Sequence, residues 1–127
     1  MNEIKDIIDD LAIAALEANT KIASVAVVSD SGELIYQTEN WDLSSSTDSI
    51  LKILKGDRSI LLNGIKFLVS DANAEGIIGT NEGGMGHIIF APFQGGVLVS
   101  YVMPGADPHR ALSILKKFAL RLNGKVQ

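Results

Sequence analysis

The residues that could carry acid–base or nucleophilic chemistry are few and scattered. The sequence has two histidines, His87 and His109, and no cysteine. His87 stands at the start of a predicted strand and His109 in the first turn of a predicted helix, and neither has a nucleophile pattern beside it. Catalysis of this kind needs the reacting groups within hydrogen-bond reach of one another. No P-loop, nucleophile elbow or HExxH motif is present either. We therefore expect a binding protein and no enzyme, with both histidines structural or interfacial.

One stretch has the spacing of a calcium-binding loop. The positions concerned are Asp71, Asn73, Glu75, Gly76, Ile78 and Glu82. Glutamate replaces Asp or Asn at the fifth position of the loop, and the preceding run IKFLVS favours a strand where a calcium loop needs a helix. We interpret the stretch as a polar turn between two strands and expect no metal site.

Two other patterns have a simple structural interpretation. EGGMG at residues 82–86 resembles part of a phosphate-binding loop, but such loops join a strand to a helix, and this one lies between predicted strands. We interpret it as a hairpin turn. The carboxylates near the N-terminus fit a solvated helix face, since none has neighbours that would shift its pKa. No cofactor is expected.

Helical periodicity marks three segments. Residues 3–16 carry an apolar stripe, with Asn2 as the predicted N-cap, and residues 47–55 form a short helix closed by Gly56. The last helix begins at Asp107-Pro108, a preferred cap followed by a preferred first residue, and ends at Gly124. Its predicted buried stripe consists of Ala111, Ile114, Leu115, Phe118, Ala119 and Leu122.

Strand patterns fill the rest of the sequence. The predicted strands are residues 22–29, 33–38, 60–62, 65–70, 76–80, 87–91 and 97–103, separated by turn signals such as Asp30-Ser31-Gly32 and Asn63-Gly64. Consecutive hairpins imply an antiparallel sheet, and the terminal helices must cover one of its faces. The sequence thus predicts an α+β fold with a central antiparallel β-sheet flanked by N- and C-terminal helices, in a single domain of residues 1–127.

Composition limits the possible partners. The net charge is −4 and charged residues make up 20% of the 127 residues, so nucleic acid is not an expected partner. Residues 1–50 carry ten acids against two bases, whereas residues 51–127 carry nine bases against five acids. This asymmetry predicts two faces of opposite sign that could orient a partner. Without cysteine or a signal-peptide pattern, a cytoplasmic protein is expected.

Several stretches carry a resemblance to a known family. VAVVSDSGELIYQT, WDLSSSTDSILKILKG, LLNGIKFLVSDANAEGIIGTNEGG and VLVSYVMPGADPHRALSILKKFALRLNG follow the order of elements in profilin, the small actin-monomer-binding protein. The chain resembles a divergent, archaeal member of that family. The resemblance implies a cytoskeleton-associated protein that binds monomeric actin and regulates its polymerisation. The order of elements also fits a roadblock or longin-type scaffold that binds a small GTPase.

The resemblance also implies which residues meet each partner. The positions that would contact actin are Lys66, Ala106, Asp107, His109, Leu112, Ser113, Lys116 and Lys117. We expect Leu112 to be exposed beside the lysines, as an interface centre would be. Polyphosphoinositides are a second expected ligand, because Arg110, Lys116, Lys117, Arg121 and Lys125 cluster near the last helix.

Profilins bind poly-proline between their terminal helices on aromatic rings, and this chain departs from that pattern. Ile4, Ile7 and Arg121 replace rings or a histidine, and only Tyr36 keeps a ring, where the family usually has tryptophan. A flat aromatic surface is what holds a proline helix. We therefore expect a degenerate groove with weak or no poly-proline binding.

Overall fold

The computed structural model describes residues 3–38 and 41–126, so the predicted cap Asn2 lies outside them. Its elements in chain order are α1 (Glu3–Glu17), β1 (Ile22–Ser29), β2 (Leu34–Gln37), α2 (Thr47–Leu54), β3 (Ser59–Leu62), β4 (Ile65–Asn73), β5 (Gly76–Thr80), β6 (His87–Phe93), β7 (Gly96–Val102) and α3 (Pro108–Leu122). The predicted order of helices and strands is confirmed.

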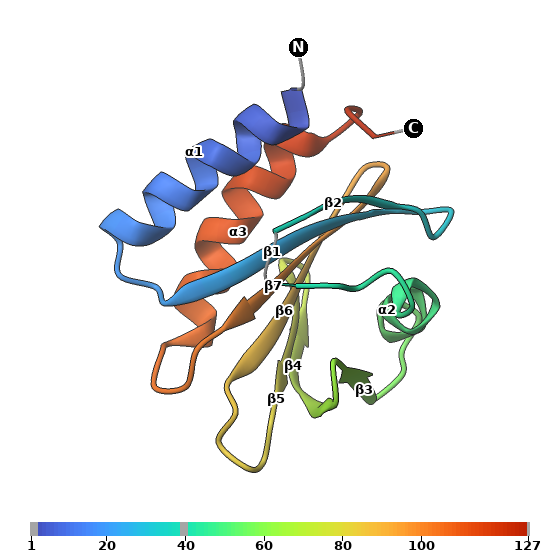
Figure 1. The fold of residues 1–127 in the computed structure, drawn as a ribbon, viewed down its shortest axis with the longest axis vertical. Helices are drawn as coiled ribbons and strands as arrows, with labels where there is room; N and C mark the ends of the chain where they lie inside the picture. The colour runs from blue at the N-terminus through green and yellow to red at the C-terminus, as the bar shows by residue number, and fades with distance from the viewer. Residues whose placement is uncertain (1–2, 39–40, 127) are drawn as a thin grey trace.

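The strands form one seven-stranded sheet in the order β2-β1-β7-β6-β5-β4-β3. Each neighbouring pair is antiparallel, and the sheet is strongly curled (Figure 1). Five of the six pairings join strands that are consecutive in the sequence. The sixth, between β1 and β7, joins the two halves of the chain. The predicted α+β class with an antiparallel sheet is confirmed.

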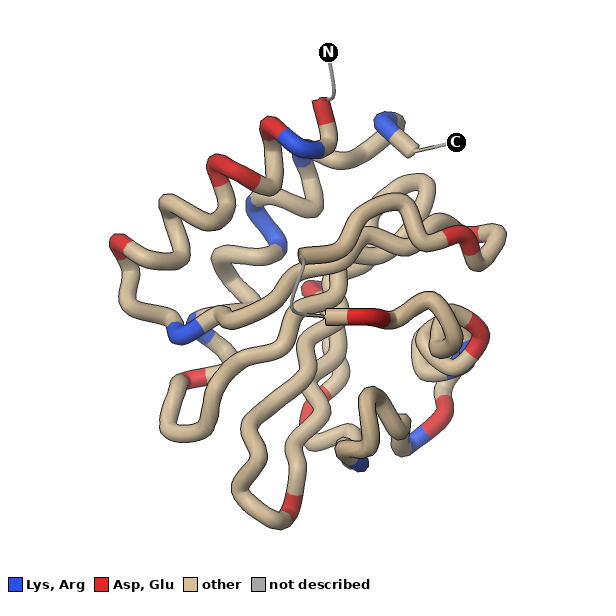
Figure 2. Tube along the Cα trace, in the orientation of Figure 1, with Lys and Arg blue, Asp and Glu red and all other residues tan. Residues whose placement is uncertain are grey.

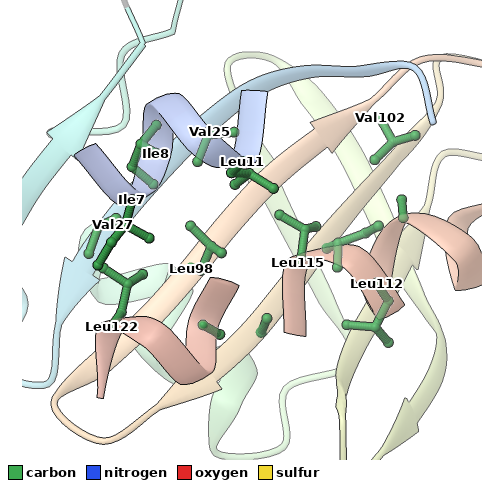
Figure 3. Close-up of a cluster of buried hydrophobic side chains, with 14 of the residues drawn as sticks. Ile7, Ile8, Leu11, Val25, Val27, Leu98, Val102, Leu112, Leu115 and Leu122 are labelled. Atoms are coloured by element: carbon green, nitrogen blue, oxygen red, sulfur yellow. The ribbon is translucent and has the colours of Figure 1, made fainter. Parts of the chain in front are cut away.

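Helices cover both faces of this sheet. The terminal helices α1 and α3 pack together on one face, and α2 lies on the other (Figure 1). In β1, Val25 and Val27 enter the core under α1 and α3, whereas Ala26 and Val28 enter the core under α2. Figure 3 shows the first of these cores, with Leu115 and Leu122 of α3 directed at the strands. Because both faces are covered, residues 25–28 of β1 are all apolar and buried, without polar alternation.

One strand is longer than its side chains predict. β4 continues three residues past the predicted end at residue 70, through Asp71, Ala72 and Asn73. These residues pair with Ile78, Ile77 and Gly76 of β5. Polar residues are poor strand formers, but backbone pairing beside a tight turn outweighs that preference. The other predicted boundaries lie within two residues of the observed ones.

The start of α3 follows the predicted capping pattern. The carboxylate of Asp107 accepts hydrogen bonds from the backbone N–H groups of His109 and Arg110, at 3.0 and 3.4 Å. At the other end, Asn123 Oδ1 accepts from the backbone N–H of Gln94 at 2.7 Å. The first turn of the helix is therefore capped, and its C-terminal end is tied to the turn between β6 and β7. Among the described residues, no helix is long and apolar enough to cross a bilayer.

Candidate functional site

Part of the sheet face that carries α1 and α3 is left uncovered by them. Phe67 points into the core under α2, so its neighbours Lys66 and Leu68 in β4 point to the opposite face. Leu61 of β3 is paired directly with Lys66 and shares that face. Lys66 is exposed and Leu61 is 62% exposed. We call Leu61, Lys66 and Leu68, with the polar residues Ser70, Thr80 and His87 beside them, the open sheet face.

Three polar side chains within hydrogen-bond distance of one another cross this face. Ser70 Oγ lies 3.0 Å from Thr80 Oγ1, which lies 3.0 Å from His87 Nδ1. Burial lowers the pKa of His87 below its usual value, so the imidazole is neutral at pH 7. The arrangement has no nucleophile activated by a charged partner, and it serves to order three adjacent strands.

The predicted contact residues at the start of α3 lie at the edge of the same face. His109 Nε2 lies 2.9 Å from Asp71 Oδ2 at the end of β4, and Ser113 Oγ donates to the His109 carbonyl at 3.1 Å. The Asp107 carboxylate is occupied as the helix cap. Ala106 is half-buried and packs against the core beneath the helix.

The lysines of α3 continue this edge. Lys116 is half-buried and Lys117 is exposed. Lys116 stands seven positions after His109, two helical turns along the same side of the helix. Lys66 stands at the opposite end of β4 from Asp71, about 17 Å away along the strand. The structure therefore places the predicted residues, except Leu112, on one face, with Lys66 at one end of it and the start of α3 at the other.

The expected exposure of Leu112 is wrong. Its side chain is 3% exposed and belongs to the core with Leu115 and Ala119. A Cβ atom on Gly76 of β5 would lie 2.9 Å from Leu112 Cδ1, so the leucine fills the space against that strand. In Figure 3 it points toward the sheet. Two residues of the predicted stripe, Ile114 and Phe118, are only half-buried. Leu112 supports the face from below and cannot be a contact residue.

The groove between the terminal helices is charged. Ile7 is buried and Ile4 is half-buried. Arg121 Nη2 pairs with Asp10 Oδ2 at 3.0 Å. The Lys125 ammonium lies 2.9 Å from Glu3 Oε2, and its hydrogen bond and charge lower the pKa of that carboxyl. The depression between the helices has a volume of about 350 Å³, and its lining consists of Glu3, Asp6, Ile7, Arg121 and Lys125.

Tyr36 does not reach that depression. It lies on β2 and lines a separate hollow beneath α1, together with Ile8 and Leu11. The structure thus brings Ile7 and Arg121 together but leaves the predicted tyrosine apart from them. No aromatic side chain is among the residues that line the depression between the helices.

The charge asymmetry takes a different form from the one predicted. Acidic positions along α1 stand beside basic positions along α3 (Figure 2). Asp10–Arg121 and Glu3–Lys125 join the two helices directly. Some of the acidic and basic side chains are therefore paired with one another across the two helices, at the surface of the molecule, where each of the four stays about half exposed.

The EGGMG stretch and the stretch with calcium-loop spacing both contain turns between strands, as predicted. Asn81 Oδ1 accepts from the backbone N–H groups of Gly83 and Met85 at 2.8 and 3.1 Å, which organises the β5–β6 turn. In the β4–β5 turn, Asn73 Oδ1 accepts from the backbone N–H of Glu75 at 2.8 Å. No group of three potential metal ligands occurs within residues 3–38 and 41–126.

Calcium is expected to leave the protein unchanged. Asp71 is engaged by His109 and Asn73 by its own turn, so the loop-like stretch offers too few preorganised oxygens. Melting curves in 5 mM calcium chloride and in excess chelator should coincide within about 1 °C. A rise of several degrees that chelator reverses would contradict this prediction.

Two features of the face were not singled out as partner contacts from the sequence. Asp71 emerges as the residue that holds His109, although 38 positions separate them. Leu61 is an exposed apolar residue of β3, and its neighbours Ile60 and Leu62 are buried. That alternation was the available signal for Leu61, whereas no local pattern points to the Asp71–His109 contact.

These features together define a class of protein. A curled seven-stranded sheet with two terminal helices on one face, a short helix on the other and an open half-face is the profilin fold. A crystal structure of Loki profilin 1 in complex with rabbit actin matches it with a TM-score of 0.87 and 31% identity, covering 99% of this chain and 98% of that one.

Sequence comparison identifies the family. The chain is 34% identical to Loki profilin-1 of Lokiarchaeum sp. over 94% of its own length and 95% of the relative's. It is 36% identical to Odin profilin of Odinarchaeota yellowstonii over 80% of its length and 86% of the relative's. No protein-family model matches the chain. The chain belongs to the profilin family, and its similarity to archaeal members agrees with the resemblance drawn from the sequence. The roadblock or longin-type alternative is set aside.

Proposed function

We propose that this profilin binds monomeric actin and regulates actin polymerisation. The observation that carries the proposal is its backbone match to Loki profilin 1, whose crystal structure is a complex with rabbit actin. The match extends over 99% of the chain, so it includes the open sheet face and the start of α3. Specific recognition depends on the shape and chemistry of such a surface more than on overall charge.

The proposed actin face combines the open sheet face with the residues just before α3 and the first three turns of that helix. Its members from the sequence prediction are Lys66, Ala106, Asp107, His109, Ser113, Lys116 and Lys117. Lys66, Lys116 and Lys117 supply positive charge that can steer and orient an acidic partner surface. Leu61, exposed beside Lys66, supplies an apolar contact that can be desolvated on binding.

A polymerisation assay with rabbit actin tests the proposal. Fluorescently labelled actin monomers are mixed with increasing amounts of this protein, and filament formation is followed in time. We expect a longer lag and slower spontaneous assembly, because a bound monomer is withheld from nucleation. Unchanged assembly at a tenfold molar excess of the protein, together with no binding in sedimentation, would rule the proposal out.

Poly-proline is expected to bind weakly or not at all. The depression between the terminal helices is lined by charged residues and Ile7, and Tyr36 lies elsewhere, so the described lining of this depression offers no flat aromatic surface to a proline helix. Titration calorimetry with a deca-proline peptide should give no dissociation constant below about 1 mM. Saturable binding in the low-micromolar range would show that another surface holds the peptide.

Polyphosphoinositides are proposed to compete with actin at low salt. Arg121 and Lys125 are paired with acids of α1, which leaves Arg110, Lys116 and Lys117 to attract anionic headgroups by roughly 1 kcal/mol each. Vesicles containing phosphatidylinositol bisphosphate should release actin from the complex at 20 mM salt, and 200 mM salt should suppress the release. Equal effects of neutral vesicles would contradict an electrostatic competition.

The protein is proposed to act without catalysis or a cofactor, in the cytoplasm and with the cytoskeleton. Its histidines serve strand and helix contacts, at Thr80 and Asp71, and the polar residues of the face form no activated nucleophile. Fractionation of host cells tests the location: recovery in the membrane pellet after high-salt washing would contradict it.

A further inference from the structure

A hollow lined by aromatic rings lies at the end of the sheet, on the side that carries α2. Its volume is about 320 Å³, within the range of small-molecule sites in proteins. The lining comes from β1, β3, β4, β7 and the segments beside them: Ala23, Ser24, Trp41, Leu62, Asn63, Ile65, Phe67, Tyr101 and Met103. Lys66 points to the other face of β4, so this hollow is separate from the proposed actin face.

The three rings of the hollow are held in place. Phe67 is buried, and its ring meets that of Tyr101 edge-on, with centroids 6.4 Å apart and planes at 66°. The Tyr101 hydroxyl donates to the carbonyl of Met85. With the Asn63 amide in the orientation that satisfies its neighbours, its oxygen accepts from Trp41 Nε1 at 3.0 Å and its nitrogen donates to the Asp42 carbonyl at 3.0 Å. A preorganised cavity loses little freedom when a ligand enters.

The chemistry of the lining selects the ligand. None of the nine residues is charged at neutral pH. The indole N–H, the Asn63 amide and the Tyr101 hydroxyl are already used in contacts within the protein. The surface that remains for a ligand is mainly ring and aliphatic carbon. An ionic group placed there would lose its hydration without gaining a charged partner, which is costly, whereas removing an apolar ring from water is favourable.

The volume sets the size of that ligand. An engineered cavity of about 150 Å³ holds benzene, and this hollow is roughly twice as large. We propose that it is a binding site for a small, uncharged molecule with one or two aromatic rings. The ring of the ligand packs among Trp41, Phe67 and Tyr101, and Met103 closes one side with a flexible thioether, a group that favours contacts with aromatic edges.

The protein carries its own reporter for this site. Trp41 is the single tryptophan of the sequence and lines the hollow, so a bromine atom bound there quenches the tryptophan fluorescence. 4-Bromobenzyl alcohol, which is neutral, is titrated into the protein. We expect saturable quenching with a dissociation constant of about 1 mM or tighter. 4-Bromobenzoate and 4-bromobenzylamine, which carry opposite charges, should bind at least about fivefold more weakly.

Two methionines provide a matched pair of variants. Met103 and Met85 are each 50% exposed, but only Met103 lines the hollow. Met103→Ala should weaken binding of 4-bromobenzyl alcohol about threefold or more, and Met85→Ala should leave it unchanged. Quenching that rises linearly without saturation, or equal dissociation constants for the wild type and Met103→Ala, would overturn the proposal. Equal binding of either charged analogue would overturn the assigned ligand class.

Discussion

Replacing Leu112 with alanine is expected to destabilise the protein by about 2–4 kcal/mol. Leu112 is 3% exposed and lies in the core shared by α1, α3 and the sheet. Its Cδ1 atom fills the space against Gly76 of β5, and the rigid backbone there cannot collapse into the cavity that alanine would leave. The melting temperature should fall by roughly 10 °C, as measured by circular dichroism, with urea titrations giving the free energy of unfolding.

The same helix supplies a matched control. Leu120 is the same residue type but 55% exposed, so Leu120→Ala should change the free energy of unfolding by no more than about 0.5 kcal/mol. If both substitutions destabilise the protein equally, the buried side of α3 has been assigned wrongly. If neither does, Leu112 lies at the surface and returns to the set of candidate actin contacts.

The sequence could locate most of the fold because local signals and tertiary structure agree. Asp107-Pro108 is a preferred start of a helix, and it starts α3. Asn63-Gly64 is a preferred two-residue hairpin turn, and both residues have positive φ, 50° and 80°, between β3 and β4. Each of these signals lies within a few residues, so neither needs knowledge of distant partners.

The phase of α3 shows where such reasoning fails. The predicted buried stripe included Ile114 and Phe118 and left Leu112 exposed. Its other members, Ala111, Leu115, Ala119 and Leu122, are buried as predicted, but Leu112 is buried with them, whereas Ile114 and Phe118 are only half-buried. The buried stripe is shifted toward Leu112 because α3 packs against β5 and β6 as well as α1. Periodicity alone cannot fix the centre of the stripe, because it depends on which side the sheet occupies.

Surface features that are built from residues far apart in the sequence could not be predicted from the sequence either. His109 and Asp71 meet only because the end of β4 passes beneath the start of α3. Trp41, Phe67 and Tyr101 come from a loop and two non-adjacent strands, and together they line one hollow. Each of the three looked like an ordinary core or strand residue by itself. In the sheet, β6 and β5 lie between β7 and β4, so the meeting of the Phe67 and Tyr101 rings depends on the curl of the whole sheet.

Replacing Lys66 with glutamate is expected to weaken the binding of rabbit actin at least about tenfold. Lys66 is exposed on the open sheet face, next to the apolar side chains of Leu61 and Leu68. The substitution removes the positive charge of Lys66, which attracts the partner. It also introduces a carboxylate that must be desolvated in the contact and finds no positive charge there to pair with. The fold should be unaffected, since the substitution is at the surface. Anisotropy titrations with labelled actin monomers measure the affinity, and thermal melts check the fold.

Lys52→Glu is the matched control for that experiment. Lys52 is an exposed lysine on α2, which packs on the opposite face of the sheet, and its reversal changes the net charge of the protein by the same amount. If long-range attraction alone governed binding, both variants would lose affinity equally, and more so at low salt. A loss confined to Lys66→Glu that persists at 150 mM salt would place the contact on the open sheet face. Full affinity in Lys66→Glu would remove Lys66 from the actin face, because a charge reversal inside a desolvated contact cannot be neutral.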